Sequence, residues 1–336
     1  MAKVVKRAGN GNGKSHGAAS VPLRARVEGG GTPEVTEWHI GREAGTLTDV
    51  LLGPAEGFRW MGEENAAWSS LVRDTMRKGL KFDKQLAMRQ HREMVEAYQS
   101  AGVTTHFLPL DECNPYQVYA RDSSFMTPYG AVLCQMANPR RRGEYAACLR
   151  FYLEKGIPIY DMVSSGNFEG GDFNIIAEKA ALIGYTDHRS EHVAAKQIAD
   201  WFIAEGWEIK WAPIDQFYVH IDLMVCMLNE HCAAVCLDTT EDDVVDWLKK
   251  RKIEIIPATF KETMALGCNV VALGKDRVLS TAGAKDLNAK MKAAGFTVYD
   301  PDMTMFTWAG GGVSVRICPL PVSVWRLSTV GSPPVV

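Results

Sequence analysis

The sequence lacks several features that would assign it to a functional class directly. In its 336 residues no apolar run approaches the roughly 18 residues that suggest a membrane span. Residues 1–9 are basic and contain no hydrophobic segment, which argues against a secretory signal. The net charge is −3, so no basic excess indicates nucleic acid or an anionic membrane as the main partner. We therefore expect a small-molecule partner, with self-association as a homo-oligomer left open.

Cysteine is too sparse for a disulfide scaffold, at eight residues in the whole chain. No two cysteines have C-x-x-C spacing, which argues against a structural zinc site. Most lie in apolar surroundings, as Cys226 and Cys236 do, and these are expected to be small buried residues. The expected location is a reducing cytoplasm, and neither a cofactor nor a resident metal is expected.

The chain divides into a tail and one large domain. Residues 1–35 are rich in glycine, serine and basic residues, and we expect a disordered basic tail there. The composition is 46% hydrophobic, which suffices for a large core. Because one repeat period runs from about residue 48 to residue 325, we predict a single α/β catalytic domain over residues 36–330.

That repeat is an amphipathic helix, a glycine and a short β-rich strand, and it occurs five times. The expected helices span residues 93–101, 144–155, 191–205, 241–251 and 284–294. A glycine follows four of them and supplies a left-handed cap, while Lys252 holds this position in the fourth unit. Five such units around one axis would form a closed ring, which also protects strand edges.

A small polar residue recurs at the start of the next apolar strand in every unit. These residues are Asp122, Asp172, Asp222, Asn269 and Ser314. If the units pack around an axis, the five loops converge on one central pit.

The same loops carry Glu169 and His220. Several carboxylates beside a histidine suit a cationic, planar, hydrogen-donating group such as a guanidinium, which carboxylates bind in bidentate fashion. The two glycines after Glu169 permit close backbone approach. His220 is suited to proton transfer. Alternatively, a divalent metal could be bound by Asp122, His220 and Asp222, the last two of which we expect on one strand face.

Five short motifs together resemble the guanidino-group-modifying superfamily of arginine deiminases, amidinotransferases and dimethylarginine hydrolases. In chain order they are Tyr119-Ala-Arg-Asp122, Phe168-Glu-Gly-Gly-Asp172, His220-Ile-Asp222, Leu266-Gly-Cys-Asn269 and Gly310-Gly-Gly-Val313. The resemblance covers roughly residues 48 to 320. It implies a five-bladed α/β propeller, in agreement with the repeat.

The resemblance also implies roles for individual residues. Asp122 and Asp222 would grip the N–H groups of the substrate, with Asp172 and Ser314 also in the binding site. Glu169 and His220 would move protons. Arg141 and Arg189 match places where deiminases keep arginines that hold the carboxylate of an amino acid.

One departure from the superfamily decides the chemistry. Its nucleophilic cysteine follows the triple glycine, in the pattern G-G-G-x-x-C, and Val315 stands at that position here. Valine cannot attack, so a covalent sulfur intermediate at this position is excluded. Three interpretations remain open. Cys318 could attack from beyond a bulge, water activated by Glu169 or His220 could attack directly, or the site could bind a ligand without turnover.

Direct attack by water is easier on an electron-poor carbon with a good leaving group. This favours a substrate other than arginine, and a divergent branch of the superfamily is similar to a 2-nitroimidazole nitrohydrolase. We expect a hydrolase of non-peptide C–N bonds that acts at the trigonal carbon of a small N–C–N compound and releases nitrite, ammonia or an amine. Val315 would line an apolar slot for a flat ring.

Overall fold

The computed structural model describes residues 33, 35–36, 38–66, 68–215 and 217–311. The expected basic tail lies almost entirely outside these residues, as do Ser314, Val315 and Cys318. The domain limits at residues 36 and 330 therefore stay predictions. Among the described residues, no helix is long and apolar enough to cross a membrane.

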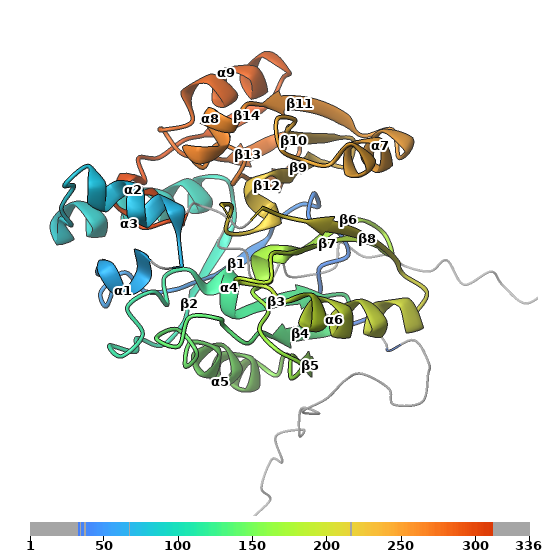
Figure 1. The fold of residues 1–336 in the computed structure, drawn as a ribbon, viewed down its shortest axis with the longest axis horizontal. Helices are drawn as coiled ribbons and strands as arrows, with labels where there is room; N and C mark the ends of the chain where they lie inside the picture. Colours follow the sequence, from blue (N-terminus) through green and yellow to red (C-terminus); the bar gives the residue numbers. More distant parts are fainter. Residues whose placement is uncertain (1–32, 34, 37, 67, 216, 312–336) are drawn as a thin grey trace, which may run out of the picture.

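Within the described residues the strands form five separate sheets, four of three strands and one of two (Figure 1). Each three-stranded sheet has an antiparallel hairpin followed by a third strand that runs parallel to the middle one. The three-stranded sheets are β3 (Ser124–Thr127), β4 (Gly130–Leu133) and β5 (Ile159–Met162); β6 (Phe173–Ala177), β7 (Ala180–Tyr185) and β8 (Glu208–Pro213); β9 (Val225–Asn229), β10 (Cys232–Cys236) and β11 (Glu254–Ala258); and β12 (Val271–Gly274), β13 (Arg277–Leu279) and β14 (Thr297–Tyr299). The two-stranded sheet pairs β1 (Asp49–Leu52) with β2 (Thr104–Phe107) in parallel.

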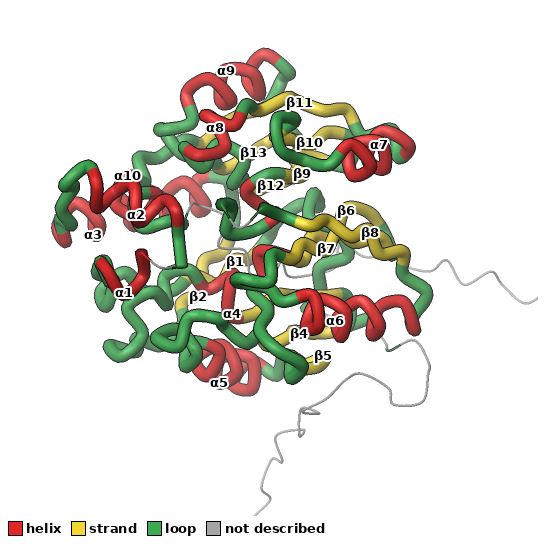
Figure 2. The backbone as a smooth tube through the Cα atoms, viewed as in Figure 1, coloured by secondary structure: helices red, strands yellow, loops and turns green. Residues whose placement is uncertain are grey.

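One helix precedes the last strand of every sheet, because two parallel strands need a crossover connection. These helices are α3 (Lys84–Ser100), α5 (Tyr145–Lys155), α6 (His192–Ala204), α7 (Asp242–Lys250) and α9 (Lys285–Ala293). They confirm the five expected helix–strand units, and they lie toward the outside of the molecule (Figures 1 and 2). The shorter helices are α1 (Glu63–Ala66), α2 (Ser70–Arg77), α4 (Ala120–Ser123), α8 (Phe260–Met264), α10 (Thr304–Thr307), and the 3₁₀ turns η1 (Gly170–Asp172) and η2 (Ile221–Leu223).

The left-handed position after each of these five helices is also confirmed. The φ angles are 81° at Gly102, 68° at Gly156, 81° at Gly206 and 94° at Gly295. Lys252 adopts the same conformation with a φ of 59°, which costs a residue with a β-carbon about 1–2 kcal/mol. The turn after α7 is therefore dictated by the fold and not by a glycine.

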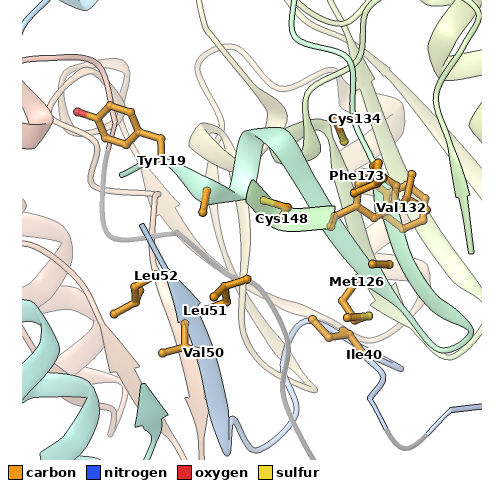
Figure 3. Packing of buried hydrophobic residues seen from close by; sticks show 14 of the residues in the cluster. Ile40, Val50, Leu51, Leu52, Tyr119, Met126, Val132, Cys134, Cys148 and Phe173 are labelled. Atoms are coloured by element: carbon orange, nitrogen blue, oxygen red, sulfur yellow. The ribbon is translucent and has the colours of Figure 1, made fainter. Parts of the chain in front are cut away.

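Aromatic packing holds the central sheets together. The rings of Phe125 and Phe173 stack at a centroid distance of 4.5 Å, and Phe202 of α6 lies 5.0 Å from Phe173. Figure 3 shows Phe173 beside Val132 in this core. These contacts join the first strand of one sheet to the first strand of the next, so the turns just before those strands rest on a close-packed base.

The polar residues singled out by the repeat occupy equivalent places in four sheets. Asp122 lies in α4, Asp172 ends η1, Asp222 lies in η2, and Asn269 comes just before β12. Helix α4 contacts η1, and η1 contacts η2. The expected convergence is confirmed for these four positions, since Asp122, Asp222 and Asn269 line one cavity and Asp172 contacts His220, which also lines it. The fifth position, Ser314, is outside the described residues.

Candidate active site

A cavity of about 50 Å³ lies where these turns meet. It has room for only a few water-sized groups, far less than the roughly 300–1,000 Å³ of pockets for drug-sized ligands. The residues that line it include Ser69, Asp122, Arg141, Arg189, His220, Asp222, Asn269 and Gly310. The structure thus gathers seven predicted site residues, since Glu169 and Asp172 contact His220 directly behind this lining.

Asp172 fixes the imidazole ring of His220. Its Oδ2 lies 2.9 Å from His220 Nδ1, and its Oδ1 accepts the backbone N–H of Ile221 at 2.8 Å. The hydroxyl of Ser190 donates to the same carboxylate. All of these groups are buried, so the ring is held in one orientation with Nε2 toward the cavity side.

His220 Nε2 faces two further carboxylates. It lies 3.2 Å from Glu169 Oε2 and 3.6 Å from Asp122 Oδ1, and among the described residues it makes no well-directed hydrogen bond. Burial by itself lowers the pKa of His220, but the carboxylates of Asp172, Glu169 and Asp122 outweigh burial and raise it to about 10. The ring is therefore a protonated donor at neutral pH.

The glycines after Glu169 allow this approach. A β-carbon on Gly171 would lie 2.8 Å from His220 Cγ, and one on Gly170 would lie 2.3 Å from the carbonyl oxygen of Arg121. Neither contact is tolerable for a residue with a side chain, so the close approach expected from the two glycines is confirmed.

Glu169 is completely buried and is paired with Arg189. Arg189 Nε lies 3.0 Å from both carboxylate oxygens, and its other nitrogens reach Glu169 Oε2 and, at 3.0 Å, the carbonyl of Trp68. The backbone N–H of Ala137 donates to Oε1 at 3.2 Å. Burial raises the pKa of Glu169, but Arg189 and His220 outweigh it, and the pKa lies well below its usual value. Glu169 is therefore ionised.

Asp122 is paired with Arg141. Arg141 NH1 donates to Asp122 Oδ2 at 2.8 Å, while its Nε and NH2 form a fork on the two oxygens of Glu144, each at 2.8 Å. The guanidinium also lies over the rings of Tyr116 and Tyr119 at 5.7 and 5.8 Å. Burial raises the pKa of Glu144 to about 7, although Arg141 opposes this.

Asp222 lies deep in the same cavity. Burial raises its pKa to about 6, against the opposing effect of His220 and Arg121. Arg121 NH2 is bound by groups other than Asp222, since it contacts Glu43 Oε1 at 3.2 Å and the carbonyl of Phe173 at 2.8 Å. A carboxyl group with a pKa near 6 changes its charge within the physiological range.

The expected strand placement of His220 and Asp222 is wrong. His220 precedes the 3₁₀ turn η2, and Asp222 lies within it, two residues before β9 begins. The turn forms because Leu223 N–H donates to His220 O and because Asp172 accepts the N–H of Ile221. Both side chains still line the cavity, but through a turn and not through strand alternation.

Three residues of the site were not predicted from the sequence. Glu144, Ser190 and the carbonyl of Trp68 each hold a predicted site residue. Only Glu144 could have been found from the sequence. It stands three residues after Arg141 at the start of a helix, and an acidic and a basic side chain at this spacing can form an ion pair.

A metal site was the alternative to an acid–base site. One group of possible metal ligands is present among the described residues, with one ligand atom from each of Asp122, Glu169 and His220 within 4.8 Å of one another. Glu169 therefore stands in this group where Asp222 was expected. Arg189 and the protonated His220 already supply positive charge to these carboxylates. A divalent cation would have to displace Arg189 and a proton, which disfavours it.

Comparisons with known proteins place this chain in one family. Residues 60–322 match the family described as "N,N dimethylarginine dimethylhydrolase, eukaryotic". The chain therefore belongs to this family, and the predicted membership of the guanidino-group-modifying superfamily is confirmed.

Two relatives and two solved structures show how far the similarity extends. The chain is 29% identical to the uncharacterized protein YkgA of Bacillus subtilis over 69% of this chain and 79% of that protein. It is 23% identical to the bifunctional arginine dihydrolase/ornithine cyclodeaminase ArgZ of Synechocystis, over 69% of this chain and 33% of ArgZ. The fold matches a Pseudomonas aeruginosa dimethylarginine hydrolase mutant complexed with citrulline (TM-score 0.66, 20% identity, 81% of this chain and 99% of that chain). It also matches the substrate-bound N-terminal domain of a cyanobacterial ArgZ (TM-score 0.70, 19% identity, 81% and 98%).

Proposed function

We propose that the protein is a hydrolase of small planar N–C–N compounds, with water as the attacking group. Its substrate is a small molecule, and its expected setting is the cytoplasm, with a homo-oligomer as one assembly to test. The five sheets would close into a five-bladed propeller around the cavity. Membership of the dimethylarginine hydrolase family supports chemistry at a guanidinium-like carbon.

The observation that carries the proposal is the arrangement around His220. A protonated imidazole on the cavity wall lies 3.2 Å from the ionised carboxylate of Glu169, which stands directly behind the lining, and 3.6 Å from the carboxyl group of Asp122, which lines the cavity of about 50 Å³. In the proposed reaction, Asp122 and Asp222 orient the N–H groups of the substrate. Glu169 accepts a proton from water as its oxygen bonds to the trigonal carbon, and His220 donates a proton to the departing nitrogen. The leaving group is nitrite, ammonia or an amine, according to the substrate.

A panel of substrates tests this proposal. Purified full-length protein would be incubated with guanidines, amidines and 2-nitroimidazole, and ammonia, amine and nitrite would be measured. We expect release of one of these products, unchanged by EDTA, and a Cys318→Ala variant that keeps nearly the full rate because water is the nucleophile.

Three outcomes would replace the proposal with an alternative. A folded but inactive Cys318→Ala variant would assign the attack to Cys318. Binding of panel compounds without any product would indicate a ligand-binding member of the family. Loss of activity with EDTA and recovery with a divalent metal would indicate a metal hydrolase.

The raised pKa of Asp222 predicts how binding depends on pH. Above about pH 6 the carboxyl group is ionised and can accept substrate N–H groups; below it the proton occupies that place. We expect the dissociation constant of methylguanidine to rise about tenfold for each pH unit below 6. Titration calorimetry between pH 4.5 and 8 would measure it. An Asp222→Asn variant should bind more weakly, and its dissociation constant should not rise below pH 6. The same rise in this variant would assign the titration to another group.

A further inference from the structure

The two arginines that could receive a substrate carboxylate are already occupied by carboxylates of the protein. The fork formed by Arg141 Nε and NH2 is filled by both oxygens of Glu144, and its NH1 is held by Asp122. Arg141 is only 3% exposed, and Glu144 is 1% exposed. A fork of this shape is the arrangement by which arginine binds a ligand carboxylate in bidentate fashion.

Arg189 is occupied in the same way. Its Nε and NH2 contact Glu169, and its NH1 donates to the carbonyl of Trp68, so each of its three nitrogens has a partner. Displacing Glu169 would leave a fully buried carboxylate without its counter-ion, which is costly. Arg189 is therefore the less accessible of the two.

Arg121 is the remaining arginine among the described residues that line the cavity. Its NH2 is held by Glu43, by the carbonyl of Phe173 and by Asn174, and its buried Nε has no hydrogen-bond partner there. Because NH2 is held by these three acceptors, Arg121 does not present the fork of Nε and NH2 that binds a carboxylate at two points.

We propose that Glu144 is a built-in counter-ion that fills the carboxylate-binding fork of Arg141, and that the pocket therefore selects guanidinium-like compounds without a carboxylate. This rests on the proposed function, and it names the substrate class: small cationic or neutral N–C–N compounds rather than amino acids. The cavity volume of about 50 Å³ agrees with a small substrate.

Two pairs of ligands isolate the carboxylate. Ethylguanidine and guanidinoacetate differ by a methyl group in place of a carboxylate, and agmatine and L-arginine differ by the carboxylate alone. With the wild-type protein we expect each carboxylate-free compound to bind at least about tenfold more tightly than its partner, measured by calorimetry at pH 7.5. In Glu144→Gln, which keeps the shape of the side chain but removes its charge and one of its two acceptor oxygens, this preference should shrink by about tenfold or more. Glu154→Gln on the exposed face of the same helix is the matched control and should leave the preference unchanged.

The outcomes separate this inference from the proposed function. Equal binding within each pair by the wild-type protein, or an unchanged preference in a folded Glu144→Gln, would overturn the role of Glu144 while leaving guanidinium chemistry in place. No binding of any of the four compounds would overturn both. If Glu144→Gln does not fold, the wild-type preference still decides whether carboxylates are excluded, and Glu144→Asp, which shortens the counter-ion, should weaken that preference.

Discussion

Replacing His220 by alanine is expected to lower kcat by about 10²–10⁴. The protonated ring lies 3.2 Å from Glu169 and 3.6 Å from Asp122, and alanine leaves no group at that point to protonate the leaving nitrogen. The measurement is kcat on the best substrate of the panel, with circular dichroism and thermal denaturation to confirm that the variant is folded.

His231→Ala serves as the control for this variant. His231 is exposed at the turn between β9 and β10, and its replacement should leave kcat within twofold. A folded His220→Ala that retains more than a tenth of the wild-type kcat would end the assignment of His220 as the proton donor.

Replacing Arg189 by methionine is expected to lower the free energy of unfolding by about 3–5 kcal/mol. Methionine has a similar length but no charge, so the fully buried carboxylate of Glu169 loses its main counter-ion. Because the folded-state pKa of Glu169 lies below its usual value, the stabilisation is present at neutral pH and is lost as the pH falls through that low folded-state pKa. Chemical denaturation at pH 7.5 would measure the first effect, and a series from pH 4 downward would measure the second.

Two further variants show whether the buried charge causes this loss. Lys196→Met removes an exposed ion pair with Asp200 and should cost less than about 0.5 kcal/mol. The double variant Glu169→Gln, Arg189→Met should recover much of the lost stability, because no buried charge then remains unpaired. A loss below about 1 kcal/mol in Arg189→Met would mean that Glu169 is stabilised by its other partners.

The parts of the fold that the sequence predicted are those with local causes. A helix with one apolar face, a left-handed residue after it and a β-branched strand are each specified within about 20 residues, and all five units are present. Even Lys252, which departs from the glycine pattern, was placed by the period of the repeat. The convergence of Asp122, Asp172 and Asp222 was predicted for the same reason, since equivalent positions in a repeat meet at one place.

The parts that the sequence did not predict depend on pairing between distant residues. The spacing of Arg141 and Glu144 indicates that they can pair, but the pairing of Arg141 with Asp122, 19 positions away, has no local signal. The contact of Arg189 with Trp68 spans 121 positions, and no periodicity encodes it. The 3₁₀ turn at Asp222 depends on Asp172 of another unit, whose carboxylate accepts the N–H of Ile221, so alternation along a strand was the wrong rule there.

The cavity is bounded by residues from the two ends of the described chain. Ser69, at the start of α2, and Gly310, after α10, lie so close that a β-carbon on Gly310 would come within 2.8 Å of the Ser69 hydroxyl. During translation, roughly 10–50 s separate the synthesis of these two residues. The part of the cavity wall where these two residues meet therefore closes only after residue 310 has been synthesised.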